Sequence, residues 1–499
     1  MSNKLNGILM AHGFGSGQAG ESLYLELYNA IKKAIIKKKL EYNTRLPPTR
    51  LLSQDLGVSR STVVKAYDIL CLENYITSVQ GSGYFVNDFQ QKKIKYSLKT
   101  YDKPTEYPSV SEKARRFRKH LNLMNRMHQP GLAFRPGLPP LDIFPVGQWQ
   151  QLTNNYWKGV KYSDLSYKSS LGLDSLRKSI VNYLKIYRNI QCHYEQVVIV
   201  TGSLHSLSIL GELLIDPGDE VIVENPTYAN AIAIFRSLKS RMTALEIDEQ
   251  GLDISDARKK VKNPKLIYTT PSNQYPSGVQ MSLQRRLELL EYANARNCLI
   301  IEDDYDHEFS NWDNPITSIF GLDKNERVIY QGTFNKLLHP SIRLGYIIVP
   351  SYLIEDIKAL YEQSLRFVSP EVQKVMSDFI ERNYFSRHLR SVLQISRERR
   401  EFFTTAFDKL FGGVLKILPV SGGLHLIVQL PETIDDVLFS DYLADNGIIT
   451  FPYSKYFSRE PKKNGLIMGF SSVSTPVIKQ KLELMYQLYT AYPAVVKAE

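Results

Sequence analysis

The apolar residues near the start of the chain recur at helical spacing. Between positions 20 and 40 they stand three or four residues apart, at Leu23, Leu27, Ile31, Ala34 and Ile35. This spacing puts the side chains on one face of a helix, so it predicts an amphipathic helix that ends near Lys39. The proline-containing stretch "LPPTR" then interrupts the pattern.

Two shorter helices and a hairpin are predicted after this break. Thr49 is placed to cap "RLLSQDLG", and Ser59 is placed to cap "RSTVVKAYDILCLENY". The apolar stripe of the longer helix runs from Val63 to Leu70, which leaves polar residues exposed at its start. "YITSVQGSGYFV" predicts two strands around a tight turn at residues 80–83. Two helices joined by a glycine-containing turn and followed by such a wing form a winged helix-turn-helix.

From Ala133 onward, strand-like runs alternate with amphipathic stretches of helical length. The helical stretches include residues 206–214, 283–295 and 352–365. The strand-like runs are "QVVIVTG", "EVIVENP", "KLIYTTP", "CLIIEDDYD", "RVIYQGT" and "GYIIVP". This alternation predicts an α/β domain with a mainly parallel sheet, whose ligands lie at the carboxyl ends of the strands.

The stretch between these two regions, residues 89–130, is basic and shows neither pattern. Residues 91–130 hold 11 lysine and arginine residues against 3 acidic ones. We interpret the stretch as a linker with one short helix, from about Ser111 to Asn122. Residues 1–130 hold 21 basic and 10 acidic residues, whereas residues 131–499 hold 41 of each sign.

The net charge of +11 therefore lies in the first quarter of the chain, which favours a polyanionic partner for that part. A solvated basic tail would give the same charge, and charge alone leaves both interpretations open. A sharper hypothesis is that the segment Lys113 to Lys119 follows the DNA backbone beside the winged domain.

Composition narrows the class of protein further. A chain of 499 residues corresponds to roughly three domain-sized units. No apolar run approaches the ~20 residues of a membrane span, and no signal peptide is visible, so we expect a cytoplasmic protein. The three cysteines, Cys71, Cys192 and Cys298, are far apart, so neither a disulfide framework nor a metal site is indicated.

Polar residues collect where the predicted strands end. They occur in "TGSLHS", "ENPTYANAI", "TPSNQYPSG" and "IEDDYDHEF", and in a turn that carries Lys336 before the buried strand 346–349. A lysine at the floor of such a site suits a Schiff base with an aldehyde cofactor. Arg343 would then suit a phosphate, because its planar fork donates two hydrogen bonds at once. Taken alone, Lys336 is better explained as a surface lysine, so the interpretation depends on what else agrees.

The N-terminal pattern resembles a known family at particular residues. "LPPTRLLSQDLGVSRSTVVKAYDILCLENYITSVQGSGYFV" is similar to the winged helix-turn-helix of the GntR family over its whole length. Asn74 stands where that family usually has glycine, and asparagine tolerates the left-handed backbone needed there. The resemblance implies that double-stranded DNA is contacted by Arg50, Ser59, Arg60, Thr62, Lys65, Gly81, Ser82 and Gly83.

The rest of the chain resembles the fold-type I aminotransferases, which use pyridoxal 5'-phosphate. "FRPGLPPLDIFP", "TGSLHSL", "ENPTYANAI", "TPSNQYPSG", "IEDDYDHEF" and "GTFNKLLHPSIRLGY" occur in the order found in those enzymes. Joined to a GntR-type head, the chain resembles the MocR/GabR-type regulators. That resemblance implies a mainly parallel central sheet with a small C-terminal α+β subdomain, and a homodimer.

The resemblance also implies a role for each matching residue. Lys336 would form the internal aldimine, and Asp303 would pair with the pyridinium nitrogen, with Asp304 as a near competitor one residue away. Tyr305 would bond the ring hydroxyl and Tyr228 would stack on the ring. The phosphate would be held by Ser203, the Leu204 amide, Thr333 and Arg343.

Several positions depart from the aminotransferase pattern. Asn335 precedes the lysine where serine is usual, and "YPSG" replaces the usual step with asparagine before the proline, so Asn273 or Gln274 would have to substitute. "GLIMGFSSVS", residues 465–474, lacks the arginine that commonly binds a substrate carboxylate near the final strand. Arg135 in "FRPG" is a candidate replacement for this arginine and would bind the small-molecule effector of such a regulator.

The sequence therefore predicts a winged domain at residues 20–88, a linker at 89–130 and an aminotransferase-like domain at 131–499. The leading hypothesis is a transcriptional regulator that senses a small amine or amino-acid-like effector through Lys336. A catalytically active aminotransferase, for which DNA binding is incidental, is the alternative. A regulator whose body has lost its cofactor is a third interpretation, which the retained Lys336, Asp303, Tyr305 and Arg343 disfavour.

Overall fold

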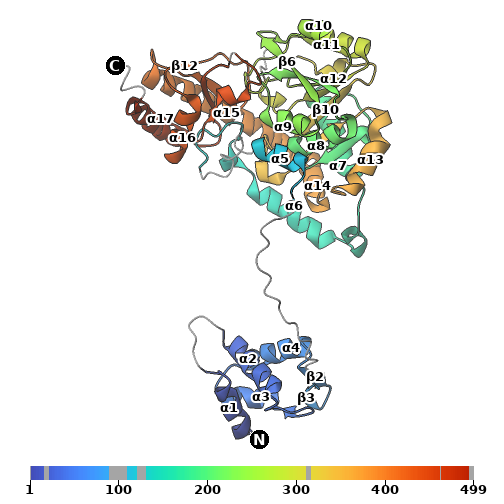
Figure 1. Cartoon of the computed structure of the whole chain (residues 1–499), viewed down its shortest axis with the longest axis vertical. Helices are drawn as coiled ribbons and strands as arrows, with labels where there is room; N and C mark the ends of the chain where they lie inside the picture. The colour runs from blue at the N-terminus through green and yellow to red at the C-terminus, as the bar shows by residue number, and fades with distance from the viewer. Residues whose placement is uncertain are drawn as a thin grey trace. The chain divides into compact units, whose positions relative to one another are not determined.

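The computed structural model describes residues 2–15, 22–88, 109–120, 131–310, 316–460 and 462–493. It divides into two compact units, residues 1–108 and residues 109–499, which Figure 1 shows with the first unit in blue. We call them the winged unit and the body and describe each by itself.

The winged unit is a small helical domain with a three-stranded antiparallel sheet. The sheet has the order β1-β3-β2, and the turn between β2 and β3 forms the wing. Apolar side chains of the helices form one core, which includes Leu27, Ile31, Val63 and Tyr67. The elements are α1 (Ser2–Ala11), α2 (Leu23–Ile36), β1 (Arg45–Leu46), α3 (Thr49–Leu56), α4 (Arg60–Leu72), β2 (Ile76–Val79) and β3 (Gly83–Val86).

One sequence prediction about this unit was wrong in detail, and one helix was not predicted. Thr49 is the first helical residue of α3 and not its cap, because Pro48 holds the extended conformation that the cap position requires. Helix α1 was not predicted, although Leu5 and Leu9 pack in the domain core. The cap Ser59 was predicted correctly, since its hydroxyl accepts a hydrogen bond of 3.1 Å from Thr62 N. Asn74 has φ of 60°, the left-handed conformation expected of it.

The linker contributes one described helix, α5 (Glu112–His120), which packs against α9 of the body. Lys113 on α5 forms an ion pair of 2.6 Å with Glu212 of the body. The helix was predicted at about residues 111–122, and the other linker positions, 89–108 and 121–130, lie outside the described residues.

The body is built on an eight-stranded sheet with the order β4-β11-β10-β9-β8-β5-β6-β7. The central strands pair in parallel, whereas β11 is antiparallel to both of its neighbours. This confirms the mainly parallel sheet. The strands are β4 (Val197–Val200), β5 (Glu220–Asn225), β6 (Arg241–Asp248), β7 (Gly251–Leu252), β8 (Pro264–Thr269), β9 (Leu299–Asp303), β10 (Val328–Thr333) and β11 (Gly345–Ile348).

Helices cover both faces of this sheet because its strands are apolar on both sides. In β4, Val198 and Val200 face one helical layer, whereas Val197 and Ile199 face the other. The first layer contains α8 (Ser203–Leu214), α9 (Ala229–Ser237) and α13 (Ile354–Gln363). The opposite side is covered by α6 (Val146–Gly159), α7 (Asp174–Tyr187), α10 (Ser255–Lys260), α11 (Leu283–Arg296), α12 (Ile319–Leu322) and α14 (Pro370–Glu381).

The C-terminal part of the body forms the predicted smaller α+β subdomain. Its four-stranded antiparallel sheet has the order β12-β13-β15-β14, and α15 and α17 pack against each other beside it. The elements are α15 (Tyr384–Phe411), β12 (Lys416–Ile417), β13 (His425–Gln429), α16 (Asp436–Asp445), β14 (Phe451–Pro452), β15 (Gly465–Gly469) and α17 (Thr475–Thr490).

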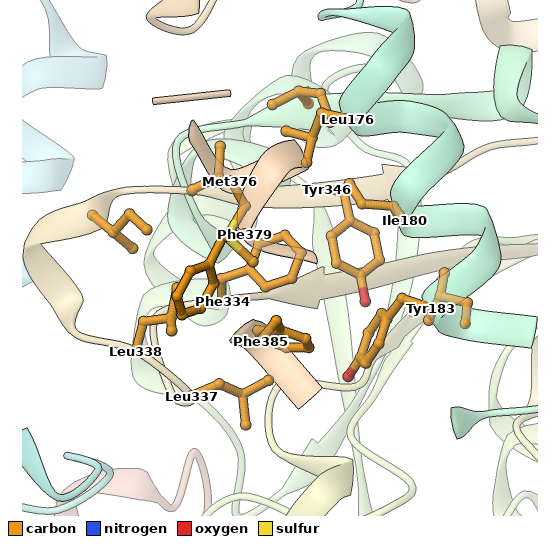
Figure 2. Packing of buried hydrophobic residues seen from close by; sticks show 14 of the residues in the cluster. Leu176, Ile180, Tyr183, Phe334, Leu337, Leu338, Tyr346, Met376, Phe379 and Phe385 are labelled. Carbon is orange, nitrogen blue, oxygen red and sulfur yellow. The ribbon is translucent and has the colours of Figure 1, made fainter. Parts of the chain in front are cut away.

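The turn that carries Lys336 is anchored in the largest core of the body. Phe334, Leu337 and Leu338 flank the lysine, and each is about 1% exposed. Figure 2 shows these side chains pointing into the same cluster as Phe379 and Phe385. Because its neighbours on both sides are buried in a packed core, the backbone of Lys336 is held in a fixed position.

Candidate functional site

The register of the large sheet brings the ends of four strands to one edge. Asp303 ends β9 and pairs with Gln331 of β10. Thr333 ends β10 opposite Gly345, the first residue of β11, and Gly345 in turn lies opposite Val200 at the end of β4. The loops that follow these strand ends therefore meet at the carboxyl edge of the sheet, where α/β proteins bind their ligands.

Lys336 lies at this edge with its amine held by the backbone. Its Nζ donates a hydrogen bond of 2.8 Å to Gly137 O. A Cβ at Gly137 would lie 2.5 Å from that Nζ, and the φ of Gly137 is +70°, a backbone conformation that favours glycine. Burial lowers the pKa of the Lys336 ammonium, against the opposing charges of Asp306 and Asp303. A lowered pKa makes the amine a better nucleophile, as Schiff-base chemistry requires.

The structure distinguishes the two adjacent aspartates that the sequence left as competitors. Asp304 Oδ2 accepts hydrogen bonds from Arg188 Nε (2.8 Å) and from the Tyr330 hydroxyl (2.6 Å). Asp303 Oδ2 accepts one from Tyr268 (2.8 Å), while no described residue donates to Asp303 Oδ1. Burial raises the pKa of Asp303 to about 6. Asp304 Oδ1 also lacks a donor among the described residues, so a free oxygen does not separate the two acids. What separates them is Arg188, which pairs with Asp304, whereas no described residue forms an ion pair with Asp303.

The pKa of Asp304 is shifted in the opposite direction because Arg188 lies beside it. Burial alone would raise its pKa, but Arg188 and then His307 hold the pKa of Asp304 well below its ordinary value. Because the Asp304 carboxylate is paired with Arg188 inside the protein, we assign it a structural role.

The start of α8 is a candidate anion site. The amides of Ser203 and Leu204 precede the first hydrogen bond of the helix, which His205 N donates to Gly202 O (3.0 Å). Free amides at a helix N-terminus bind phosphate groups. The positive charge of Arg343 acts on this end of the helix, because it lowers the pKa of His205 after the larger effect of burial.

The loop before Lys336 contributes to the same place. Thr333 Oγ1 accepts a hydrogen bond of 3.2 Å from Asn335 N. Asn335 Nδ2 lies 3.1 Å from the position that a Cβ of Gly202 would occupy. The asparagine that departs from the family pattern is thus a neighbour of the anion site, and it brings an amide donor to it.

Aromatic side chains line the other side of the site. Asn230 Nδ2 donates a hydrogen bond of 2.6 Å to the Tyr228 hydroxyl, and Asp303 and Arg343 both affect the pKa of Tyr228 after the larger effect of burial and that bond. The Tyr275 ring lies 6.0 Å from the Tyr228 ring and 5.9 Å from the Tyr305 ring. Tyr305 donates its hydroxyl hydrogen to Asn273 O (3.0 Å).

The remaining expected site residues have other partners. Asn273 Nδ2 donates to Asp306, and Gln274 donates to the buried carboxylate of Glu224 (3.0 Å). Arg135 lies two residues before Gly137, the glycine whose carbonyl oxygen accepts from Lys336, and its Nε donates to Gly131 O (3.3 Å). Strand β15 contains Met468, a fully buried core residue, and no arginine.

These residues fit pyridoxal phosphate. The Lys336 amine, the free Asp303 Oδ1 and the amides that begin α8 match the aldehyde, the ring nitrogen and the phosphate of that cofactor. Sequence reasoning missed Gly137, Tyr268, Arg188 and Asp306, whose positions depend on contacts between distant parts of the chain.

In the winged unit, the expected DNA-contacting residues lie at the start of α3, the start of α4 and the wing. Arg50, Ser59, Arg60, Lys65, Gly81 and Ser82 are exposed, whereas Thr62 and Gly83 are half-buried. Arg45 was not predicted, although it is exposed on β1 and its Nε lies 3.5 Å from the position that a Cβ of Gly83 would occupy. No periodic pattern marks Arg45, since only the pairing of β1 with β3 brings it to the wing.

Comparisons with known proteins decide the family. Residues 151–461 match the sequence model of the aminotransferase class I and II family, and residues 23–86 match that of the bacterial regulatory proteins of the gntR family. The chain is 31% identical over 470 residues to the probable rhizopine catabolism regulatory protein MocR of Rhizobium meliloti, which covers 94% of each protein. The chain belongs to the MocR-type regulators.

Other relatives agree with this membership. The chain is 27% identical over 451 residues to the HTH-type pyridoxine biosynthesis transcriptional regulator PdxR of Corynebacterium glutamicum, which covers 90% of this chain and 92% of that protein. The crystal structure of an archaeal alanine:glyoxylate aminotransferase matches with a TM-score of 0.68 at 26% identity, covering 77% of this chain and 96% of that one.

As a MocR-type regulator, the chain joins a DNA-binding domain to an aminotransferase domain and is a pyridoxal phosphate-dependent transcriptional regulator. The family and fold class predicted from the sequence are therefore confirmed. In the part of the chain that the structure describes, no helix has the length and apolar character to cross a membrane.

Proposed function

We propose that this MocR-type regulator changes its binding to an operator when a small amine reacts at Lys336. The observation that carries the proposal is the meeting of Lys336, the free Asp303 Oδ1 and the start of α8 at one sheet edge. DNA binding by the winged unit does not require a nucleophilic lysine in the body. Its use as a sensor explains both domains together.

In this proposal the cofactor supplies an aldehyde that reacts reversibly with amines. Lys336 would bind that aldehyde, Asp303 would hold the proton on the ring nitrogen, and Tyr305 and Asn273 would bind the ring hydroxyl. Tyr228 would stack on the ring. Ser203, the Leu204 amide, Thr333 and Arg343 would bind the phosphate, because the free amides and the positive charge of Arg343 favour a dianion.

A working aminotransferase is the second candidate, since Lys336 and Asp303 would also serve turnover. The regulator is favoured because β15 offers no arginine for a substrate carboxylate and because the winged unit is complete. Release of a new oxo acid from an amino-acid mixture, at a rate unaffected by DNA, would support the enzyme.

We also propose that the body forms a homodimer through the exposed aromatic residues of the segment 157–167. In this segment Trp157, Tyr162 and Tyr167 are 52%, 95% and 75% exposed, which is unusual for such large side chains. Changing Trp157 and Tyr162 together to lysine is expected to convert a dimer into a monomer in sedimentation velocity. The matched change Tyr42→Lys, in the winged unit, should leave the mass unaltered. A monomeric parent protein would end the proposal.

The function itself is tested by titrating the full-length, cofactor-loaded protein into DNA. A binding site is first selected from random duplexes, and its affinity is then measured with and without added amines. We expect an effective amine to change the dissociation constant of the parent and to leave a Lys336→Ala variant unaffected. An amine that acts equally on both proteins would contradict the sensor.

The same titration tests the winged unit. Arg60→Ala is expected to weaken binding by about 1–3 kcal/mol, the range for an arginine that contacts DNA. Arg382→Ala, which alters an exposed arginine of the body, is the matched control and should bind as the parent does. Equal affinities for all three proteins would exclude Arg60 from the DNA-binding surface.

A further inference from the structure

Three buried hydrogen-bond acceptors without partners surround the loop of Gly422 and Gly423. They are Asp306 Oδ2, His425 Nδ1 and Asn273 Oδ1, and no described residue donates to any of them. Asp306, His425 and Asn273 are each 1% exposed. Buried acceptors without a donor are costly, so three of them in one place require an explanation.

The other atoms of these side chains fix their character as acceptors. Asn273 Nδ2 donates to both Asp306 Oδ1 (2.9 Å) and Asp306 O (3.1 Å), which leaves Asn273 Oδ1 and Asp306 Oδ2 free. Two acceptors around one amide nitrogen also settle the orientation of that amide. His425 Nε2 lies 2.8 Å from Pro276 O, which only accepts, so Nε2 donates and Nδ1 is the acceptor in the neutral ring.

The two glycines mark where these acceptors converge. A Cβ at Gly423 would lie 3.1 Å from Asp306 Oδ2 and 3.8 Å from His425 Nδ1. A Cβ at Gly422 would lie 2.7 Å from Asn273 Oδ1. A Cβ at Gly422 would also lie 2.6 Å from Phe309 O, so glycine is the residue that lets this loop approach the three buried acceptors closely.

The place adjoins the reactive lysine. Burial lowers the pKa of Lys336 and raises that of Asp306, and the charge of each group opposes this effect of burial on the other. The Tyr275 ring, which neighbours Tyr228 and Tyr305, lies 5.1 Å from the His425 ring. Burial raises the pKa of Asp306 to about 8, so a cationic group beside Oδ2 is needed to hold this carboxyl group ionised, and therefore an acceptor, at neutral pH.

From this geometry, and resting on the proposed amine sensor, we infer which class of amine the site takes. The effector carries, besides the amine that reacts at Lys336, a hydroxyl or ammonium group that donates to Asp306 Oδ2, His425 Nδ1 and Asn273 Oδ1. A carboxylate in that position would face three acceptors and be repelled. The site thus selects an amino alcohol or a diamine, which also accounts for the lack of an arginine on β15.

The test uses four amines of equal chain length that differ only in the distal group. They are n-butylamine, 4-amino-1-butanol, 1,4-diaminobutane and 4-aminobutyrate, titrated into the cofactor-loaded full-length protein while its visible absorbance is recorded. The amino alcohol and the diamine are expected to bind about tenfold more tightly than n-butylamine, the effect of one charge-assisted hydrogen bond. 4-Aminobutyrate should bind more weakly than n-butylamine.

An Asp306→Asn variant sharpens the test, because it preserves shape and replaces the acceptor Oδ2 with an amide donor. In this variant the preference should reverse, with 4-aminobutyrate gaining on 1,4-diaminobutane. Asp256→Asn, at an exposed surface acid, is the matched control and should rank the amines as the parent does. Thermal unfolding of each variant, recorded in the same buffer, shows whether it is folded.

The outcomes separate this inference from the proposal beneath it. Equal affinity for all four amines, or tightest binding of 4-aminobutyrate, would overturn the inference while leaving an amine sensor intact. The latter result would point to Arg400, whose charge also lowers the pKa of His425 after the larger effect of burial. If no amine alters the spectrum, the sensor proposal fails and the inference fails with it.

Discussion

Replacing Lys336 with alanine is expected to abolish the visible absorbance of the protein purified with pyridoxal phosphate. The aldehyde of the cofactor has one nucleophile at the centre of the site, the amine that Gly137 O holds in place. Loss of that covalent bond leaves only the phosphate and ring contacts, so the cofactor should wash out on dialysis. The measurement is an absorption spectrum of parent and variant, prepared in the same way and compared at equal concentration.

The control is Lys358→Ala, which removes an exposed lysine of α13 that pairs only weakly with Glu355 at 3.8 Å. This variant should keep the parental spectrum. A parent that stays colourless when pyridoxal phosphate is added, or a Lys336→Ala variant that stays coloured after dialysis, would contradict the assignment of Lys336. The winged unit is a separate compact unit, so operator binding in the absence of amine should survive in both variants.

The sequence was sufficient for features that depend on local pattern. The strands β4, β5, β8, β9, β10 and β11 all coincide with short β-rich runs, because a parallel sheet covered on both faces requires continuous apolar residues. Lys336 could be selected from many lysines only because the other motifs at the strand ends agreed with it in the order found in fold-type I aminotransferases. Ser59 could be identified as a cap since its hydroxyl acts within three residues of its own position.

Features that depend on distant contacts could not be obtained in this way. Asp303 and Asp304 are adjacent at the end of one strand, where neighbouring side chains face opposite sides. What separates their roles is Arg188, which is 116 residues away in the chain. The acceptors around Gly422 and Gly423 are equally non-local, because Asn273, Asp306 and His425 come from three separate loops and strands.

Arg188 also gives rise to the largest expected effect on stability. Its guanidinium makes three hydrogen bonds in the buried edge of the sheet, to Asp304 Oδ2 (2.8 Å), Ile316 O (2.8 Å) and Ser272 Oγ (2.6 Å). Changing Arg188 to methionine keeps much of the volume and leaves the Asp304 carboxylate buried without its cation. Removing one partner of a buried ion pair costs about 3–5 kcal/mol. The free energy of unfolding of the body, measured with urea, should therefore fall by that amount.

The pH dependence of the stability lost in Arg188→Met identifies the cause of that loss. In the parent, Arg188 depresses the folded-state pKa of Asp304, so the pair stabilises the fold above the ordinary pKa of an aspartate and loses this effect only in strong acid. In the variant the largest cause that opposes burial is removed, and only His307 and the hydrogen bonds of Ser272 and Tyr330 remain, so we expect the folded-state pKa to rise above the ordinary value. Protonation of Asp304 then favours folding, and the deficit should shrink as the pH falls from about 8 to about 5.

The matched control for this prediction is Arg285→Met. Arg285 pairs with Asp248 and Asp253 at 2.6 Å and 2.8 Å, but both acids are largely exposed, so the change should cost less than about 1 kcal/mol. A deficit in Arg188→Met that stays constant between these pH values would mean that lost packing, and not an unpaired carboxylate, is responsible. In that case Asp304 would be protonated already in the parent, and the distinction between it and Asp303 as the acid of the site would have to be withdrawn.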